Sequence, residues 1–211
     1  MSAKAGDRET RRQEDKETSR QGDRRTPASG GLSGVSVSPC LRVWLVGYRA
    51  TGKTTVARLL AERLGWAWVD ADVALEERAG RSIRQVFAER GEAGFREMEA
   101  ELLGELCRRE RHVIATGGGV VLRPENRRRL RESGRVVWLT ADADTLWKRL
   151  RGDAATAERR PALTVGGRAE VEELLRVREP LYREVAGLTV DTAGRTPADV
   201  AASIHVWLQA L

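Results

Sequence analysis

The stretch that most constrains the fold of this chain is GYRATGKT, residues 47–54, which joins an apolar run to an amphipathic pattern. The run before it, LRVWLV, has the length and apolar character of a buried strand, and VARLLAERLG after it has the apolar spacing of a helix. The turn fits the pattern G-x-x-x-x-G-K-[ST], in which backbone N–H groups surround phosphate oxygens. The sequence therefore predicts a strand, a phosphate-binding loop and a helix.

The residue types of this loop match the needs of a bound nucleotide. Lys53 is expected to reach the β- and γ-phosphates, and Thr54 to offer its hydroxyl to Mg²⁺. The other ATP contacts predicted in the loop are Gly47, Ala50, Thr51, Gly52 and Thr55. A glycine turn with an exposed lysine is the alternative, and the flanking strand and helix patterns argue against it.

Short β-rich runs alternate with longer helical patterns from residue 41 onward, which predicts a parallel sheet with crossover helices. Strands are predicted at 41–46, 66–69, 112–116, 135–140 and 187–191. Helices are predicted at 53–64, 92–109, 124–133, 142–150, 169–185 and 197–210. We therefore expect an α/β fold of three layers, a five-stranded parallel sheet flanked by helices.

Two stretches fall outside this alternation. Residues 1–38 hold no aromatic residue and no run of large apolar residues, so they are predicted to form a disordered charged tail before a domain at 39–211. Residues 151–167, RGDAATAERRPALTVGG, have no helical or strand period. A loop of that length is usually a functional lid or a disordered segment. Its arginines and its place after a helix favour the lid.

Charge and cysteine content limit the class of protein. The net charge is +6, and the domain at 39–211 supplies +4 of it (29 basic and 25 acidic residues), which suits an anionic ligand such as a nucleotide. Cys40 and Cys107 have no metal-ligand or redox spacing, and the tail lacks a signal-peptide pattern. No stretch approaches the ~18 apolar residues of a membrane span. We expect a monomer in the cytoplasm that does not bind membranes.

Two acidic residues follow the second predicted strand. Asp70 and Asp72 lie where ligands bind in an open parallel sheet, outside the carboxyl ends of its strands. One could hold the Mg²⁺ shell, and the other could accept a hydrogen bond or a proton from an acceptor hydroxyl. An ordinary helix N-cap is the structural alternative.

Two further clusters bear on the acceptor of the phosphate. Arg96 and Glu99, in GEAGFREMEAELL, lie on one helix face, where Arg96 could clamp a carboxylate or form an ordinary surface ion pair. Gly117, Gly118 and Gly119 follow the strand HVIAT, and glycines at a strand's carboxyl end let a ligand lie against the backbone. Three glycines in a row beside a P-loop favour contact with a ligand, and the role of Arg96 stays open at this point.

In order along the chain, GYRATGKTT, WVDAD, GEAGFREME, ATGGGVV, RRPAL and VREPLYREVA resemble shikimate kinase, a small P-loop kinase of the nucleoside-monophosphate-kinase type. The match runs from about Val43 to Leu208. The resemblance implies a P-loop kinase fold with a lid and Mg²⁺ as cofactor. It also implies transfer of the γ-phosphoryl group of ATP to the 3-hydroxyl of shikimate, in the pathway to chorismate and the aromatic amino acids.

The resemblance also implies roles for individual residues. Lys53, Asp72 and the lid residue Arg160 would be catalytic, with Asp72 near the accepting hydroxyl, and Asp70 would be the aspartate associated with Mg²⁺. Arg160 is chosen over Arg159 because it directly precedes Pro161. The shikimate contacts would be Asp72, Arg96, Gly117, Gly118, Gly119 and Arg178.

The adenine site is implied less sharply. Arg151, favoured over Arg149, would stack on the base, with Arg195 and Pro197 nearby. Tyr48 and Arg49 are bulkier than the family pattern leads us to expect after the first glycine, and Arg49 could touch phosphate or face solvent.

Two other functions compete with this one. A sister kinase such as gluconate kinase would share the P-loop and the lid but has no reason to carry GFR and RxPLY together. A nucleic-acid-binding protein would suit the sequence pI of about 10.0. However, the tail alternates its charges and has no aromatic residue on which bases could stack, so we expect no nucleic-acid partner.

Overall fold

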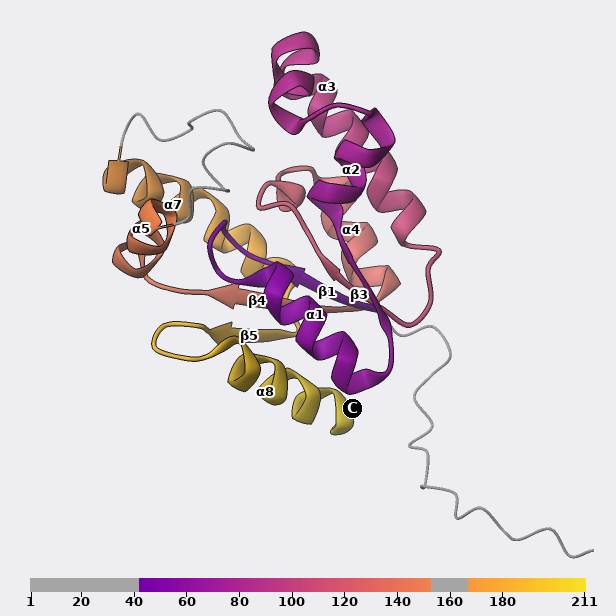
Figure 1. Cartoon of the computed structure of the whole chain (residues 1–211), viewed down its shortest axis with the longest axis vertical. Helices are drawn as coiled ribbons and strands as arrows, with labels where there is room; N and C mark the ends of the chain where they lie inside the picture. The colour runs from indigo at the N-terminus through magenta and orange to yellow at the C-terminus, as the bar shows by residue number, and fades with distance from the viewer. Residues whose placement is uncertain (1–41, 153–166) are drawn as a thin grey trace, which may run out of the picture. The chain divides into compact units, whose positions relative to one another are not determined.

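A parallel sheet of five strands forms the centre of the fold (Figure 1). The computed structural model has the strands in the order β2-β3-β1-β4-β5, with every neighbouring pair parallel. The strands are β1 (Arg42–Val46), β2 (Ala67–Asp70), β3 (His112–Ala115), β4 (Arg135–Thr140) and β5 (Leu188–Asp191). The five predicted strands and the predicted α/β class are thereby confirmed.

The structure describes residues 42–152 and 167–211. The tail predicted for 1–38, Cys40, Arg159, Arg160 and most of the lid predicted for 151–167 lie outside the described residues. No helix within the described ranges is long and apolar enough to span a membrane.

The helices follow the predicted alternation closely. They are α1 (Lys53–Leu64), α2 (Ala71–Ala79), α3 (Ile83–Leu106), α4 (Pro124–Ser133), α5 (Ala143–Gly152), α7 (Gly167–Val185) and α8 (Pro197–Gln209), with a short 3₁₀ turn, η1 (Val120–Leu122). Both α1 and α4 have the predicted bounds, and α5, α7 and α8 differ from their predictions by one or two residues at an end.

The sequence prediction missed α2 and the part of α3 before residue 92. Helix α2 begins where the Asp70 side chain accepts hydrogen bonds from the N–H groups of Asp72 and Val73. Ser82 and Gln85 form a capping box that starts α3. Gly91, with φ of 65°, then breaks the regular helix, so only the part after it coincides with the helix predicted from residue 92. These helices begin at caps rather than at a strong apolar period, which is why periodicity alone did not find them.

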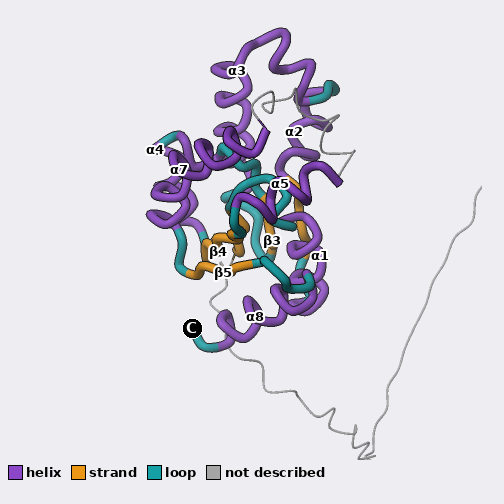
Figure 2. Tube along the Cα trace, turned by 90° about the vertical axis from the view of Figure 1, so that its left-hand side faces the viewer, coloured by secondary structure: helices purple, strands orange, loops and turns teal. Residues whose placement is uncertain are grey.

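Side chains of the central strand alternate between two cores. Val43 and Leu45 pack with α1 and α8, whereas Trp44 and Val46 pack with α3, α4 and α7. Figure 2 shows the strands enclosed by helices. This arrangement is the three-layer fold that the sequence predicts, because strands with both faces buried read as continuous apolar runs.

The central strand delivers the loop at 47–54 to a crowded position. Because β1 lies between β3 and β4, its carboxyl end meets the ends of both neighbours. Gly47 has φ of 139°, and a side chain at this position would overlap the carbonyl oxygen of Leu139 in β4. Only glycine fits, so the first glycine of the motif is required by the sheet as well as by any ligand.

We predict that Gly47→Ala lowers the melting temperature and abolishes nucleotide binding, because the new Cβ must push β4 away from the loop. Gly65→Ala is the matched control: Gly65 also has positive φ, of 65°, but a Cβ there meets no atom within 4 Å. The control should show a small loss of stability and full ATP binding. Thermal melts and ATP titration calorimetry measure both effects, and equal behaviour of the two variants would contradict the steric argument.

Candidate active site

Lys53 is held over the loop at 47–54 before any ligand arrives. Its Nζ donates hydrogen bonds to the carbonyl oxygens of Gly47, at 2.9 Å, and Tyr48, at 2.7 Å. The hydroxyl of Thr51 donates to the same Tyr48 carbonyl at 2.8 Å. The lysine is 9% exposed, so its charge is fixed where the loop curls round the start of α1. The positive end of the α1 dipole and this ammonium group favour the same anion.

Thr54 and Asp70 meet at the ends of β1 and β2. The Thr54 hydroxyl donates to Oδ2 of Asp70 at 2.5 Å, while Oδ1 of Asp70 accepts from the first turn of α2. Asp70 is therefore both a helix N-cap and a neighbour of the P-loop threonine. Its role as a cap does not compete with a place beside a bound Mg²⁺. A hydroxyl and a carboxylate oxygen side by side are ligands that Mg²⁺ prefers.

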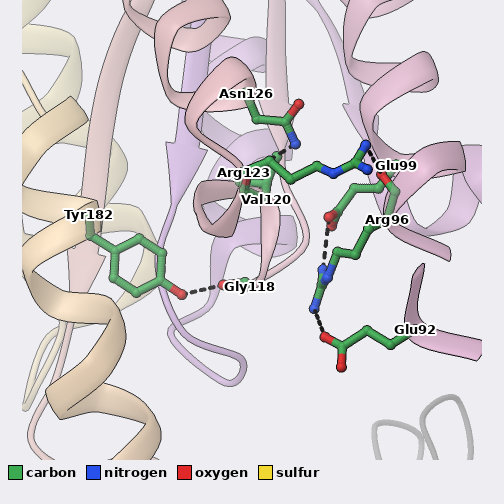
Figure 3. Close-up of polar contacts among 8 residues, drawn as sticks. All are labelled: Glu92, Arg96, Glu99, Gly118, Val120, Arg123, Asn126 and Tyr182. Atoms are coloured by element: carbon green, nitrogen blue, oxygen red, sulfur yellow. Dashed lines mark hydrogen bonds and ion pairs between the residues drawn. The ribbon is translucent and has the colours of Figure 1, made fainter. Parts of the chain in front are cut away.

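Arg96 forms a buried ion pair on α3 (Figure 3). Its Nη1 donates to Glu99 at 2.8 Å, and its Nη2 donates to Glu92 at 3.3 Å. The side chains of Arg96 and Glu99 are only 12% and 8% exposed, which excludes the ordinary surface ion pair. The guanidinium lies so close to the backbone of Gly119 that a Cβ there would overlap it. The third glycine of TGGG thus makes room for Arg96.

Tyr182 fixes the other side of the glycine loop. Figure 3 shows it approaching Gly118 from α7, opposite the side from which Arg96 comes. The fully buried Tyr182 donates its hydroxyl to the carbonyl oxygen of Gly118, and its ring stacks on Trp138 of β4, with centroids 5.9 Å apart. Tyr182 lies within the motif VREPLYREVA, and its role was not predicted from sequence. A tyrosine one turn after Arg178 was the available signal.

Asp72 also lies beside the glycine loop. It lines a small cavity together with Thr116, Gly117 and Glu99, at the junction of α2, α3 and β3. The structure thereby brings Asp72 and Arg96 to the three consecutive glycines, from which both are far apart in sequence. Arg178, from α7, is 9% exposed, and its Cζ lies 5.9 Å from the ring centroid of Tyr48 in the P-loop.

A second pocket lies beside the P-loop. Its lining residues are Ala50, Thr51, Gly52, Val56, Arg149, Thr192, Arg195, Pro197 and Val200. Four of the residues predicted to contact ATP are among them, namely Ala50, Thr51, Gly52 and Arg195. Thr55 does not line this pocket and is exposed on the first turn of α1.

The structure places Arg149, and not Arg151, against this second pocket. Arg149 donates to the carbonyl oxygens of Thr192, at 2.7 Å, and Ala50, at 3.3 Å. Arg151 is exposed near the end of α5 and does not line the pocket. Helix α5 itself is anchored at Asp142, where hydrogen bonds from the hydroxyl and the N–H of Thr145 hold the pKa of Asp142 below its ordinary value.

Comparison with known proteins decides the family. The family model described as shikimate kinase matches residues 49–209. The chain belongs to the shikimate kinase family. A shikimate kinase of Rhodopirellula baltica is 47% identical over 159 residues, which cover 75% of this chain and 85% of that protein. A solved shikimate kinase from Acinetobacter baumannii, in complex with shikimate, is 37% identical, with a TM-score of 0.76, and covers 82% of this chain and 93% of its own.

The sister kinase considered from sequence shares the fold. A gluconokinase from Sinorhizobium meliloti superposes with a TM-score of 0.54 at 19% identity, over 80% of this chain and 91% of its own. At that identity the likeness concerns the P-loop kinase fold alone. The family resemblance drawn from GFR, TGGG and RxPLY is confirmed by the family match.

We predict that Tyr182→Phe lowers the free energy of unfolding by about 1–3 kcal/mol, because the buried carbonyl of Gly118 loses a donor while ring stacking is kept. Tyr48→Phe is the matched control, since the Tyr48 hydroxyl is also buried but has no hydrogen-bond partner among the described residues. Urea unfolding of both variants tests this. A loss in Tyr48→Phe as large as that in Tyr182→Phe would contradict it.

Proposed function

We propose that this chain transfers the γ-phosphoryl group of ATP to the 3-hydroxyl of shikimate, giving shikimate 3-phosphate and ADP. The observation that carries the proposal is the buried Arg96, held by Glu99 against Gly119 in the same site as the P-loop. A buried guanidinium beside glycine backbone suits a small acceptor with a carboxylate, and the chain belongs to the shikimate kinase family. The product belongs to the biosynthesis of the aromatic amino acids.

In the acceptor site, arginines bind the charged group of the acceptor and Asp72 accepts a hydrogen bond from its hydroxyl. Arg96 and Arg178 bind the carboxylate of shikimate, and the backbone of Gly117, Gly118 and Gly119 lies against the ring. Glu99 orients the guanidinium of Arg96 by a hydrogen bond to Nη1. The buried Nε of Arg96 has no hydrogen-bond partner in the described part of the chain, so it is available to a ligand. Asp72 accepts a hydrogen bond from the hydroxyl that attacks, or takes its proton.

The phosphate side works by positioning and charge neutralisation, because phosphoryl transfer passes through a loose transition state. Lys53 turns from the loop carbonyls to the β- and γ-phosphates, and the loop amides fix their oxygens. The Thr54 hydroxyl and Asp70 would hold Mg²⁺, which would supply positive charge against the charge that develops on the phosphate oxygens. Arg160, outside the described residues, keeps its predicted role over the phosphates.

The base of the nucleotide occupies the pocket lined by Arg149, Arg195 and Pro197. Arg149 is the better candidate than Arg151 for contact with adenine, because it lines that pocket and is fixed by Thr192. Arg195 is held at the start of α8 through hydrogen bonds to Asp199 and Ser203. We also propose that the enzyme acts as a monomer in the cytoplasm.

We predict that shikimate raises the rate of ADP release by the purified protein, with ATP and Mg²⁺, above the rate without acceptor. Gluconate and quinate should not raise it. Gluconate lacks the rigid ring that the glycine loop contacts, and quinate differs from shikimate at the ring carbon that bears the carboxylate. A coupled ADP assay measures the rates. Stimulation by gluconate alone would assign the acceptor site to the sister kinase reaction, and ATP binding without stimulation by any acceptor would refute the acceptor site.

We predict that Arg96→Lys raises the KM for shikimate about tenfold or more and leaves the KM for ATP nearly unchanged, since lysine cannot hold Glu99 and a carboxylate together in a planar fork. Arg78→Lys is the control because Arg78 forms exposed ion pairs with Glu101 and Glu105 on the surface. It should leave both constants unaltered. An unchanged KM for shikimate in Arg96→Lys would remove Arg96 from the acceptor site.

A further inference from the structure

Tyr48 is fixed in the P-loop by a small apolar cluster. The side chain is 2% exposed and packs with Leu146 of α5, Val171 and Leu175 of α7, and Ala141. Its ring joins the phosphate-binding loop to the pair of helices α5 and α7, so the orientation of the ring is determined by the core.

Two guanidinium groups lie close to this one ring. The Cζ of Arg49 is 5.6 Å from the ring centroid of Tyr48, and the Cζ of Arg178 is 5.9 Å from it. Both distances fall within the range of a cation–π interaction. The Tyr48 ring therefore holds one arginine from the P-loop and one from α7 in a single arrangement, which we call the Tyr48 cluster (Tyr48, Arg49 and Arg178).

The Tyr48 cluster carries positive charge that its own surroundings do not neutralise. Within residues 42–152 and 167–211, no carboxylate forms an ion pair with Arg49 or Arg178, and the buried Nη2 of Arg49 has no hydrogen-bond partner. Arg96, in contrast, is paired with Glu92 and Glu99. Buried charge is costly unless it is paired, so the two unpaired guanidinium groups favour an anion between or beside them.

The position of Arg49 indicates which anion this is. Its backbone nitrogen is 3.6 Å from the point where a Cβ on Gly118 would lie, so Arg49 adjoins the acceptor loop. The nucleotide pocket is lined by its neighbours Ala50, Thr51 and Gly52 but not by Arg49 itself. Arg178, whose guanidinium lies near the same Tyr48 ring, is already assigned to the acceptor. These placements favour the acceptor over the nucleotide.

We propose that the P-loop itself takes part in acceptor recognition: Arg49 binds the acceptor's carboxylate alongside Arg178, and Tyr48 is the positioning residue that holds both guanidinium groups. The inference rests on the proposed function, because it takes shikimate as the acceptor. Tyr48 and Arg49, the bulky residues after the first glycine, thereby act in acceptor binding as well as in the phosphate-binding loop.

The test compares Arg49→Ala with the wild-type enzyme against two ligands, shikimate and its methyl ester, which lacks the negative charge. Loss of one charge-assisted contact should raise the dissociation constant for shikimate roughly 5- to 50-fold and leave that for the methyl ester nearly unchanged. Titration calorimetry measures both, with Arg58→Ala, an exposed position on α1, as the control that should behave as wild type.

The role of Tyr48 is tested by a pair of variants. Tyr48→Phe keeps the ring and should retain wild-type affinity for shikimate, whereas Tyr48→Leu removes the ring and should raise the KM for shikimate several-fold with the KM for ATP and kcat little changed. A general loss of structure in Tyr48→Leu would lower kcat and both affinities together, and the Arg49→Ala measurement would still decide the proposal.

The outcomes separate this inference from the proposed function. If the wild-type enzyme phosphorylates shikimate but Arg49→Ala loses affinity for neither ligand, or for both equally, the Tyr48 cluster does not bind the carboxylate. If Arg49→Ala lowers kcat and leaves the KM for shikimate unchanged, Arg49 acts on the transferred phosphate and the proposal is overturned. If the wild-type enzyme does not respond to shikimate at all, the proposed function itself fails.

Discussion

The close approach of β1 and β4 at Gly47 is the constraint on which the rest of this structure depends. The backbone of Gly47 lies against the Leu139 carbonyl, and this contact turns the chain from the central strand into the P-loop. The turn places Lys53 within hydrogen-bond distance of the loop carbonyls and brings Tyr48 into the core with residues of α5 and α7. Because the loop is fixed on both sides, the two pockets beside it keep defined positions. We propose one of them for the nucleotide and the other for the acceptor.

Charge in the proposed acceptor site is arranged unevenly. Arg96 is oriented by a buried carboxylate, which fixes its geometry and offsets part of its charge. Arg178 and Arg49 have no such partner in the described part of the chain and are held by an aromatic ring instead. An anion that enters the site thus meets one guanidinium, that of Arg96, whose orientation is fixed by a carboxylate. It also meets two guanidinium groups whose positive charge no carboxylate of the described residues offsets. This combination fits a small carboxylate better than a neutral polyol, because the neutral ligand would leave the arginines unpaired.

Much of the fold could be predicted from local pattern, and the exceptions have local causes. The strands at 42–46 and 135–140 and the helices at 53–64 and 124–133 have strong apolar runs or periods, and the structure confirms them. Helix α2 was missed because its start depends on the cap at Asp70 and its apolar residues are mostly small. Arg149 and Arg151 both precede the predicted lid, so the sequence offers either of them for the adenine site. Their separation by two residues puts them on different sides of α5, and only packing against Thr192 distinguishes them.

The sequence by itself determined the phosphate-binding loop, the α/β class and the set of residue types that a carboxylate acceptor needs, because strand and helix periods and glycine spacing are local properties. Tertiary structure alone decided which of these residues act together. It turned Asp70 into both a cap and a neighbour of Thr54, placed Arg96 against Gly119, and connected Tyr182 to Gly118. It also put Arg49 and Arg178 on one ring, 129 positions apart in the chain (178 minus 49). Contacts of this kind arise from strand order and helix packing, which no short stretch of sequence encodes.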